Sequence, residues 1–268
     1  LPLMKRILDK LLVRAMPGHG IALRSTSKAG CTTLAQALYR DATGQPFPGN
    51  NVHARRPDGL LWGRQTLPTF QRDDLHGVTS VRNPFDRILS AYLDKVVTLP
   101  TAVSDNGLVE FHPYRGGDKH YVRIRDAFQF GSHYPEKQVE EFGRFIRVLG
   151  LVYLEGKYRS VRDRHFDPYH GPITRFRELV EANGGKFSVL RLENLTEGIA
   201  EVMPGGLNPE KPLIANKGKV RKTQPPSSFF HDPVVVKIIQ DIYANDFENW
   251  DYPAEPPQPK PLAPFPPK

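Results

Sequence analysis

The chain has 268 residues, with 37 Lys or Arg against 29 Asp or Glu, and therefore a formal net charge of +8. No window reaches the roughly 18 apolar residues of a membrane span, and the single cysteine, Cys31, excludes an intrachain disulfide. The positive charge indicates an anionic partner, without choosing among phosphates, nucleic acid, acidic glycans and a lipid surface. The length allows one large α/β domain or two small ones, and we expect one.

Along the chain, the N-terminal segment 4–16 alternates basic and apolar residues at helical spacing, which predicts an amphipathic helix. Further strands are predicted near 20–24, 77–81 and 186–192, and helices near 32–41, 84–97, 136–148, 174–183 and 233–245. Strands that alternate with helices predict a parallel sheet covered on both faces. Three segments are rich in Gly, Pro, His and basic residues: 42–66, 99–134 and 204–231. We expect them to be loops that shape an acceptor cleft.

The stretch IALRSTSKAGCTTLAQAL, residues 21–38, passes from an apolar run through small and polar residues into a helical pattern. The backbone amides of Lys28 to Thr33 are then expected at the N-terminus of the helix, where they favour an anion. An ordinary turn, with Gly30 relieving strain and Thr32 or Thr33 capping the helix, is the alternative. A nucleotide-triphosphatase loop has its lysine after the last glycine, whereas Lys28 precedes Gly30, which argues against kinase or ATPase chemistry.

The stretch HGVTSVRNPFDRILSAYLDK, residues 76–95, predicts a strand followed by a helix that Asn83 caps. Apolar residues at i, i+3, i+4 and i+7 form a stripe that should face the core: Phe85, Ile88, Leu89 and Tyr92. Arg82 at the end of the strand and Ser90 on the helix are then candidates for a phosphate clamp. In the alternative, Arg82 pairs with a carboxylate and Ser90 is merely exposed.

Taken together, SKAGCTT and RNPFDRILSAY resemble the motifs of the membrane-bound-type carbohydrate sulfotransferases (sulfotransferase family 2-like) and their bacterial relatives. Ser27 stands where that family usually has proline. Weaker similarities follow in VEEFGRFIRVL, DRHFDP, FSVLRLENL and DFENWDY. The resemblance implies a P-loop-NTPase-like, three-layer α/β fold with a central parallel sheet flanked by helices. We expect one sulfotransferase domain over residues 1–252 and a Pro-rich, extended tail over 253–268.

The family's donor is 3′-phosphoadenosine 5′-phosphosulfate, abbreviated PAPS, and its product is adenosine 3′,5′-bisphosphate. The resemblance implies that Lys28 stabilises the leaving phosphate oxygen and that Arg82 and Ser90 hold the 3′-phosphate. The residues expected to cradle the 5′ end are Ala29, Gly30, Cys31, Thr32 and Thr33. A late basic run is expected to close over the nucleotide or the acceptor with Lys217, Lys219 and Arg221. This scheme needs no metal, because the cations are side chains.

An acceptor hydroxyl needs a base near neutral pH, for which histidine is suited. His53 is the first candidate, because related enzymes place a catalytic residue in that interval, and His165 in DRHFDP is the second. The resemblance favours a glycan or glycolipid acceptor, and a protein tyrosine, a small alcohol and a phenol are the alternatives. No nucleic acid is expected as a partner, and the basic chain is compatible with peripheral membrane contact. A bacterial cytoplasm is the expected location, or a Golgi lumen if a eukaryotic anchor has been removed. The alternative is a noncatalytic, basic glycan- or nucleic-acid-binding protein.

Overall fold

The computed structural model describes residues 2–48, 52, 59–97, 101–103, 109–111, 137–207 and 226–257. The chain forms two compact units. Unit 1 comprises Leu1–Arg82 and Tyr169–Lys217, and unit 2 comprises Asn83–Pro168 and Gly218–Lys268. The single domain over residues 1–252 stays a prediction.

Among its described residues, unit 1 contains a five-stranded sheet with the order β3-β1-β2-β4-β7. Its strands are β1 (Val13–Ala15), β2 (Ile21–Arg24), β3 (Leu61–Trp62), β4 (His76–Val81) and β7 (Lys186–Arg191). The pairs β2–β4 and β4–β7 are parallel, whereas β1 is antiparallel to both β2 and β3. The sheet is therefore mostly parallel, with β1 alone running in the opposite direction among the described strands. The predicted parallel sheet is confirmed for β2, β4 and β7, and the antiparallel strand β1 was not predicted.

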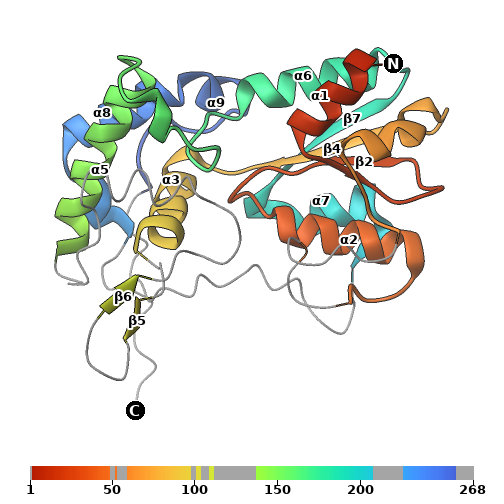
Figure 1. Cartoon of the computed structure of the whole chain (residues 1–268), viewed down its shortest axis with the longest axis horizontal. Coiled ribbons are helices and arrows are strands. Elements are labelled where there is room, and N and C mark those ends of the chain that lie inside the picture. Colours follow the sequence, from red (N-terminus) through yellow and green to blue (C-terminus); the bar gives the residue numbers. More distant parts are fainter. Residues whose placement is uncertain are drawn as a thin grey trace. The chain divides into compact units, whose positions relative to one another are not determined.

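Helices cover both faces of this sheet (Figure 1). On one face lie α1 (Pro2–Leu11) and α6 (His170–Glu181), and on the other lie α2 (Cys31–Thr43) and α7 (Leu195–Val202). Successive β2 residues pack on opposite sides: Ala22 joins the apolar cluster beneath α1 and α6, and Leu23 joins the cluster beneath α2 and α7. Such alternation is expected of a strand that is covered twice. The mixed α/β class with flanking helices is confirmed, and the P-loop-NTPase-like topology stays a prediction.

The N-terminal helix is shorter than its sequence pattern predicts. It ends at Leu11, Leu12 adopts a left-handed backbone with φ 55°, and residues 13–15 form β1. Pairing with β2 and β3 satisfies the backbone groups of this segment and buries all three side chains, which outweighs the helical periodicity.

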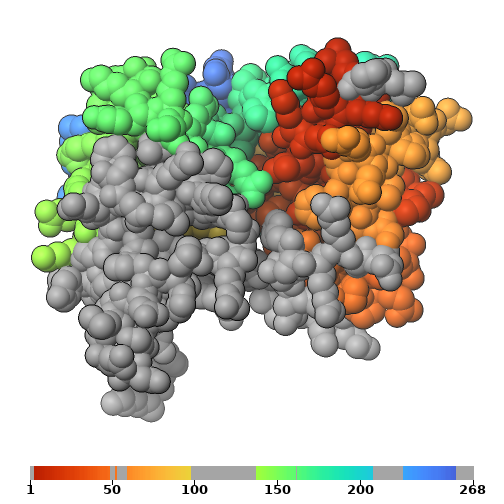
Figure 2. Space-filling view, viewed as in Figure 1, coloured from red at the N-terminus to blue at the C-terminus, as the bar shows by residue number. Residues whose placement is uncertain are grey.

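The apolar stripe of α1 faces the core of unit 1, where Leu8 and Leu11 are buried. Its polar side contacts η1, a 3₁₀ helix over Gly63–Gln71 that the sequence did not predict, and the Arg64 guanidinium lies 2.8 Å from the Asp9 carboxylate. The red atoms of α1 and the orange atoms of η1 adjoin on the surface of unit 1 in Figure 2. None of the helices in the described part of the chain combines the length and apolar character that a membrane span requires.

Unit 2 is built mainly of helices. Its described helices are α3 (Pro84–Tyr92), continued by a π-helical turn over Leu93–Val97, then α5 (Gln138–Tyr153), η4 (Arg159–Val161), η7 (Pro226–Phe230), α8 (Pro233–Ile242) and α9 (Ala244–Asn249). Two short strands, β5 (Thr101–Val103) and β6 (Val109–Phe111), pair in antiparallel orientation. The predicted helices near 84–97, 136–148 and 233–245 are confirmed, the last of them as two helices.

The start of α3 follows the prediction from sequence. The Asn83 side chain accepts a hydrogen bond of 2.9 Å from the Phe85 amide, and Pro84 occupies the first turn. All four residues of the apolar stripe are buried: Phe85, Ile88, Leu89 and Tyr92. Tyr92 packs against Phe142 of α5, with 5.1 Å between the ring centroids, and Phe85 packs against Phe230 of η7, with 5.2 Å.

Candidate functional site

In unit 1, a six-residue loop, residues 25–30, connects β2 to α2. Lys28 and Gly30 adopt left-handed conformations, with φ 64° and 84°. A Cβ atom on Gly30 would lie 2.9 Å from methyl carbons of both Leu192 and Leu195, so only glycine fits there without a shift. Gly30 itself precedes the helix, and no side chain caps α2 at this position. The alternative in which Thr32 or Thr33 caps the helix is therefore not what the structure shows.

Three consecutive carbonyl groups of this loop are held by side chains. Ser27 O accepts from the Tyr169 hydroxyl at 2.5 Å. Ala29 O accepts from Ser80 Oγ at 2.5 Å, and Lys28 O accepts from Arg82 Nη1 at 3.4 Å.

These hydrogen bonds to the carbonyls fix the direction of the amide groups in the loop. A trans peptide points its C=O and the following N–H in opposite directions, so the N–H groups of Lys28 and Gly30 face away from the side chains that hold Ser27 O and Ala29 O, while the Ala29 amide donates to Thr26 O at 3.3 Å. An α helix also has no internal acceptor for its first N–H groups. The amides of Lys28 and Gly30 and the first N–H groups of α2 are therefore the kind of donors that anion sites at helix N-termini use.

A buried polar network fixes the loop to β4. Thr26 Oγ1 lies 3.0 Å from Thr79 Oγ1 and accepts from Arg24 Nη1 at 2.9 Å. Thr79 Oγ1 donates in turn to Arg24 O at 3.3 Å. Because β2 and β4 are parallel neighbours, their carboxyl ends meet at one edge, which brings Lys28 and Arg82 together as the sequence predicted.

The potential around the loop is positive. Lys28 and Arg82 contribute two cations, and the N-terminal end of α2 adds its dipole. A third cation is Arg14 of β1, a buried residue whose guanidinium stacks 3.9 Å from the Trp62 ring centroid. Burial lowers the pKa of Arg14 to about 10, partly offset by the nearby Cys31, so the guanidinium is charged at neutral pH. Arg14 was not predicted as a site residue, because the sequence shows only an arginine between two apolar residues, Val13 and Ala15.

Several predicted site residues do not belong to this loop. Ser90 lies on the last turn of α3 in unit 2 and is half-buried. His53, Lys217, Lys219 and Arg221 lie outside the described residues. The roles predicted for them stay predictions.

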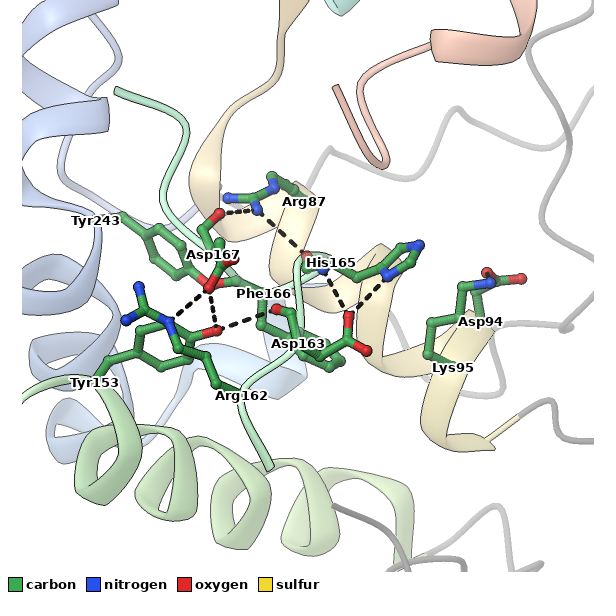
Figure 3. Close-up of polar contacts among 10 residues, drawn as sticks. All are labelled: Arg87, Asp94, Lys95, Tyr153, Arg162, Asp163, His165, Phe166, Asp167 and Tyr243. Atoms are coloured by element: carbon green, nitrogen blue, oxygen red, sulfur yellow. Dashed lines mark hydrogen bonds and ion pairs between the residues drawn. The ribbon is translucent and has the colours of Figure 1, made fainter. Parts of the chain in front are cut away.

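In unit 2, His165 forms a dyad with Asp163 (Figure 3). One carboxylate oxygen, Asp163 Oδ1, lies 2.8 Å from His165 Nδ1 and also accepts from the His165 backbone amide at 2.8 Å. Only 11% of the His165 side chain and 4% of the Asp163 side chain are exposed.

Burial and charge set the protonation states of this dyad. Burial lowers the pKa of His165, an effect that the Asp163 carboxylate offsets only in part. For Asp163, burial alone would raise the pKa, but the hydrogen bonds from His165 outweigh it, and the net shift is downward. At neutral pH the dyad is therefore a carboxylate and a neutral imidazole. Nδ1 carries the proton that bonds to Asp163, and Nε2 carries the basic lone pair.

Two tyrosines hold the backbone around the dyad. Tyr153 Oη donates to Asp163 O at 3.1 Å and to the Asp167 carboxylate at 2.8 Å. Tyr243 Oη donates to Phe166 O at 2.6 Å. The Phe166 ring is buried and lies edge-on to Phe145, with 5.0 Å between centroids. The segment 163–167 is thus fixed although it is neither helix nor strand.

Arg87 of α3 completes this framework. Its Nη2 donates to His165 O at 3.3 Å and to Asp167 O. The guanidinium is 1% exposed, and Nη1 lies 3.8 Å from the carboxylate of Asp246, which is equally buried. Arg87 lies within the motif RNPFDR and Asp163 within DRHFDP, but no role was predicted for either from the sequence. A carboxylate two residues before a histidine was the available signal.

In the described part of the chain, no group of three or more His, Cys, Asp or Glu side chains is arranged to hold a metal ion. Comparison with curated proteins and with solved structures yields no match. The sequence pattern of the Sulfotransferase family, in contrast, matches residues 13–253. That range contains the β2–α2 loop with Lys28 and Gly30, Arg82 at the end of β4, and the Asp163–His165 dyad. The chain belongs to the sulfotransferase family.

Proposed function

We propose that this protein transfers the sulfuryl group of PAPS to a hydroxyl group of a carbohydrate acceptor. The observation that carries the proposal is the β2–α2 loop. Its carbonyls are turned to Tyr169, Arg82 and Ser80, so that its amides, Lys28 and the start of α2 favour an anion on the other side. The 5′-phosphosulfate of PAPS is an anion of the required kind.

The proposed reaction is an in-line displacement at sulfur. A bond forms between the acceptor oxygen and sulfur, while the bond from sulfur to the 5′-phosphate oxygen breaks. A base takes the hydroxyl proton, and adenosine 3′,5′-bisphosphate leaves with the electron pair of the broken bond. Such a transfer needs alignment and neutralisation of charge more than covalent help from the protein. Lys28 is the group that would neutralise the leaving oxygen.

The 3′-phosphate of the nucleotide is what distinguishes this donor from ATP. Arg82 is proposed to hold it, supported by its position at the carboxyl end of β4 and its contact with Lys28 O. For Ser90 of unit 2 the proposal rests on the resemblance alone. The carbohydrate acceptor, in a glycan or glycolipid, is likewise proposed from the resemblance.

The experiment measures thermal unfolding with adenosine 3′,5′-bisphosphate, with ATP and Mg²⁺, and with neither. A ligand at about 100 times its Kd stabilises the folded state by roughly 2.7 kcal/mol, so we expect a clear rise in Tm with the bisphosphate only. Arg82→Ala should abolish that rise. Arg72→Ala is the matched control, because Arg72 precedes the opposite end of the same strand and pairs with Asp74 at 2.7 Å. It should leave the response unchanged.

Two results would overturn the proposal. Equal stabilisation by ATP with Mg²⁺ would indicate a general nucleotide site. No stabilisation by the bisphosphate, together with polyanion binding that weakens steeply with salt, would indicate a noncatalytic, basic binding protein. Specific stabilisation would be followed by incubation with PAPS and a panel of unsulfated glycans, with mass spectrometry to detect a sulfated product.

A further inference from the structure

A cavity of about 480 Å³ lies within unit 2, where α5 and α8 are in contact (Figure 1). Its lining residues come from α5, from η7 and from the segment that leads into α8, and we call it the α5–α8 cavity. Its volume lies in the range of about 300–1,000 Å³ that is typical of small-molecule sites. The proposed reaction uses none of its residues, so the cavity calls for an explanation of its own.

Part of the lining of the α5–α8 cavity is apolar and fixed. The side chains of Phe229 and Val235 line it and are otherwise buried. The Phe229 ring lies edge-on to Phe142, with 5.5 Å between the ring centroids. A ligand in the cavity therefore meets a rigid apolar surface.

Gly143 leaves the cavity open on the side of α5. Its backbone belongs to a regular helix and has no positive φ, so the conformation does not require glycine, which destabilises a helix relative to alanine. A Cβ atom there would lie 3.2 Å from Arg147 Nη1 and 3.6 Å from a Val235 methyl carbon. Further along α5, a Cβ atom on Gly150 would instead lie 3.3 Å from a methyl carbon of Ile238. Gly150 thus serves close packing of two helices, whereas Gly143 leaves space beside a guanidinium.

The polar side chains of the cavity are held in place by bonds to one another and to the backbone. Asp232 Oδ2 accepts from Arg147 Nη2 at 2.6 Å, and Asp232 Oδ1 accepts from the Val234 amide at 2.8 Å. The bond from Arg147 is the largest cause that lowers the pKa of Asp232, so this carboxyl group is ionised at neutral pH. His231 Nδ1 donates to Ser228 O at 2.7 Å, because a carbonyl oxygen can only accept. Groups held in this way lose little freedom when a ligand binds.

Charged groups of both signs line the cavity, which restricts the chemistry of its ligand. Arg147 offers a fork of N–H donors, and Asp232 and Glu140 offer carboxylate acceptors. An anionic ligand would face the two carboxylates, and a cationic ligand would face the guanidinium. A hydroxyl group both donates and accepts, so a neutral ligand with several hydroxyl groups can bond to all three side chains. A sugar is such a ligand, and its C–H groups can pack against the apolar surface.

We infer that the α5–α8 cavity binds a sugar unit and gives unit 2 an accessory site for the carbohydrate acceptor. The inference rests on the proposed function for the role of that sugar, whereas the preference for a sugar follows from the groups in the cavity. An accessory site holds the acceptor without touching the reacting atoms. Its loss should therefore raise the KM for the acceptor and leave kcat unchanged.

The first test measures sugar binding in the absence of a donor. Chemical-shift titration of the ¹⁵N-labelled protein with maltotriose, cellotriose and N,N′-diacetylchitobiose should give a Kd of about 1 mM or lower for at least one of them. Glucuronate and glucosamine are the anionic and cationic probes. The inference is overturned if none of the neutral sugars binds, or if either charged probe binds more tightly than all of them.

The second test fills the cavity. Gly143→Leu should abolish sugar binding, although leucine favours a helix more than glycine does, so Tm should not fall. A role in helix packing alone would predict no change in sugar binding. Gly150→Ala is the matched control on the same helix, because its new methyl group meets Ile238 outside the cavity, and sugar binding should stay unchanged. Should Gly143→Leu lower Tm, Gly143→Ala takes its place, with a weakened rather than abolished affinity.

The third test removes the donors of the cavity. Arg147→Met should raise the Kd for the sugar at least about 10-fold, because hydrogen bonds with a charged partner are the stronger ones. Arg147→Lys keeps a cation beside Asp232 but not the planar fork, and its Kd should lie between the two. Lys237→Met is the control, because Lys237 forms an exposed ion pair with Asp241 on α8, at 2.5 Å, and does not line the cavity.

The outcomes separate this inference from the proposed function. If a neutral sugar binds but adenosine 3′,5′-bisphosphate does not, the proposed function fails and the cavity is still a sugar site. If the bisphosphate binds and no neutral sugar does, the inference alone is overturned. Sugar binding that persists in both Gly143→Leu and Arg147→Met would place the sugar elsewhere and also overturn it. Once a sulfated product is detected, a fall in kcat with an unchanged KM in these variants would contradict an accessory role.

Discussion

The β2–α2 loop of unit 1 and the segment Asp163–Asp167 of unit 2 solve one structural problem in the same way. Both are irregular backbone whose carbonyls are held by side chains distant in the sequence: Tyr169, Arg82 and Ser80 in the first, and Tyr153, Tyr243 and Arg87 in the second. In each, a tyrosine hydroxyl and an arginine replace the backbone partners that a helix or strand would supply.

The two regions differ in the functional groups that they present. In the loop, cations and amides are the groups that remain, and no carboxylate contributes to the contacts described above. In the segment, a carboxylate directs a neutral imidazole. The first arrangement favours an anion and the second favours a proton acceptor, which are the two requirements of sulfuryl transfer to a hydroxyl. Similar backbone support therefore serves opposite electrostatic purposes in the two regions.

Removing Arg87 should have the largest effect. Arg87→Met removes the guanidinium that lies 3.8 Å from the buried Asp246 carboxylate, together with the donor to two carbonyls. Breaking a buried ion pair on one side costs about 3–5 kcal/mol. Urea denaturation should show a loss of that size in the free energy of unfolding.

A double variant sharpens this prediction. Arg87→Met with Asp246→Leu replaces both charges by apolar groups, so it should be more stable than the sum of the single losses implies. A strictly additive loss would mean that the hydrogen bonds to the segment, rather than the ion pair, account for the stability. The bisphosphate response, which belongs to the loop in unit 1, should persist in whatever fraction remains folded.

Gly30→Ala should have the second largest effect, and it acts on the loop. The left-handed backbone and the two leucine methyl groups at 2.9 Å both oppose a Cβ atom, and we expect a loss of about 2 kcal/mol with loss of bisphosphate binding. Gly44→Ala is a matched control at the other end of α2, because Gly44 has φ 68° but no atom near its Cβ position. Equal losses in both variants would show that backbone strain alone matters and that the fit against the leucines does not.

The loop was predictable from sequence because its determinants are local. Lys28 and Gly30 lie between an apolar run and a helical pattern, and Arg82 follows the next strand of the sheet, so the rules of parallel sheets bring them together. The start of α3 was predictable for the same reason, since Asn83, Pro84 and the apolar stripe all lie within ten residues. The order of residues along the chain, helix capping and hydrophobic periodicity supported these predictions.

What could not be predicted depends on contacts between distant residues. β1 lies inside a helical pattern and forms only because β2 and β3 pair with it. Tyr169 holds Ser27 across 142 positions, and Tyr243 holds Phe166 across 77. The sequence marks these tyrosines as aromatic residues and nothing more, so the support of both regions became visible only in the structure.

Exchanging a tyrosine for phenylalanine in each region should have a smaller effect. Tyr169→Phe and Tyr243→Phe each remove one hydrogen bond to a carbonyl, and each should cost about 1 kcal/mol. Each variant should change a property of its own region only. Tyr169→Phe should weaken bisphosphate binding without changing the His165 tautomer, and Tyr243→Phe should do the reverse. If either variant changed both properties equally, the two regions would not be independent supports.

The pH dependence of stability should show the smallest effect, because Asp163 offsets part of the burial of His165. The folded-state pKa of His165 lies below the unfolded value of about 6.5, so the unfolded state binds more protons in that interval. Stability due to neutral His165 is therefore present above about 6.5 and is lost as the pH falls through the folded-state pKa. Asp163 acts in a lower window, losing its contribution as the pH falls from about 3.9 through its own lowered pKa.

His76 provides the counterpart in unit 1, because burial and Lys186 lower its pKa as well. Free energies of unfolding measured in urea at pH 7, 6 and 5 should decrease with acid in the wild type. His165→Asn and His76→Asn should each flatten that decrease, and the double variant should flatten it most, since the two groups titrate in different units and their contributions add. A wild-type slope in His165→Asn would mean that the ring is not held neutral by its surroundings, and the dyad would then lack the property that distinguishes it from the cationic loop.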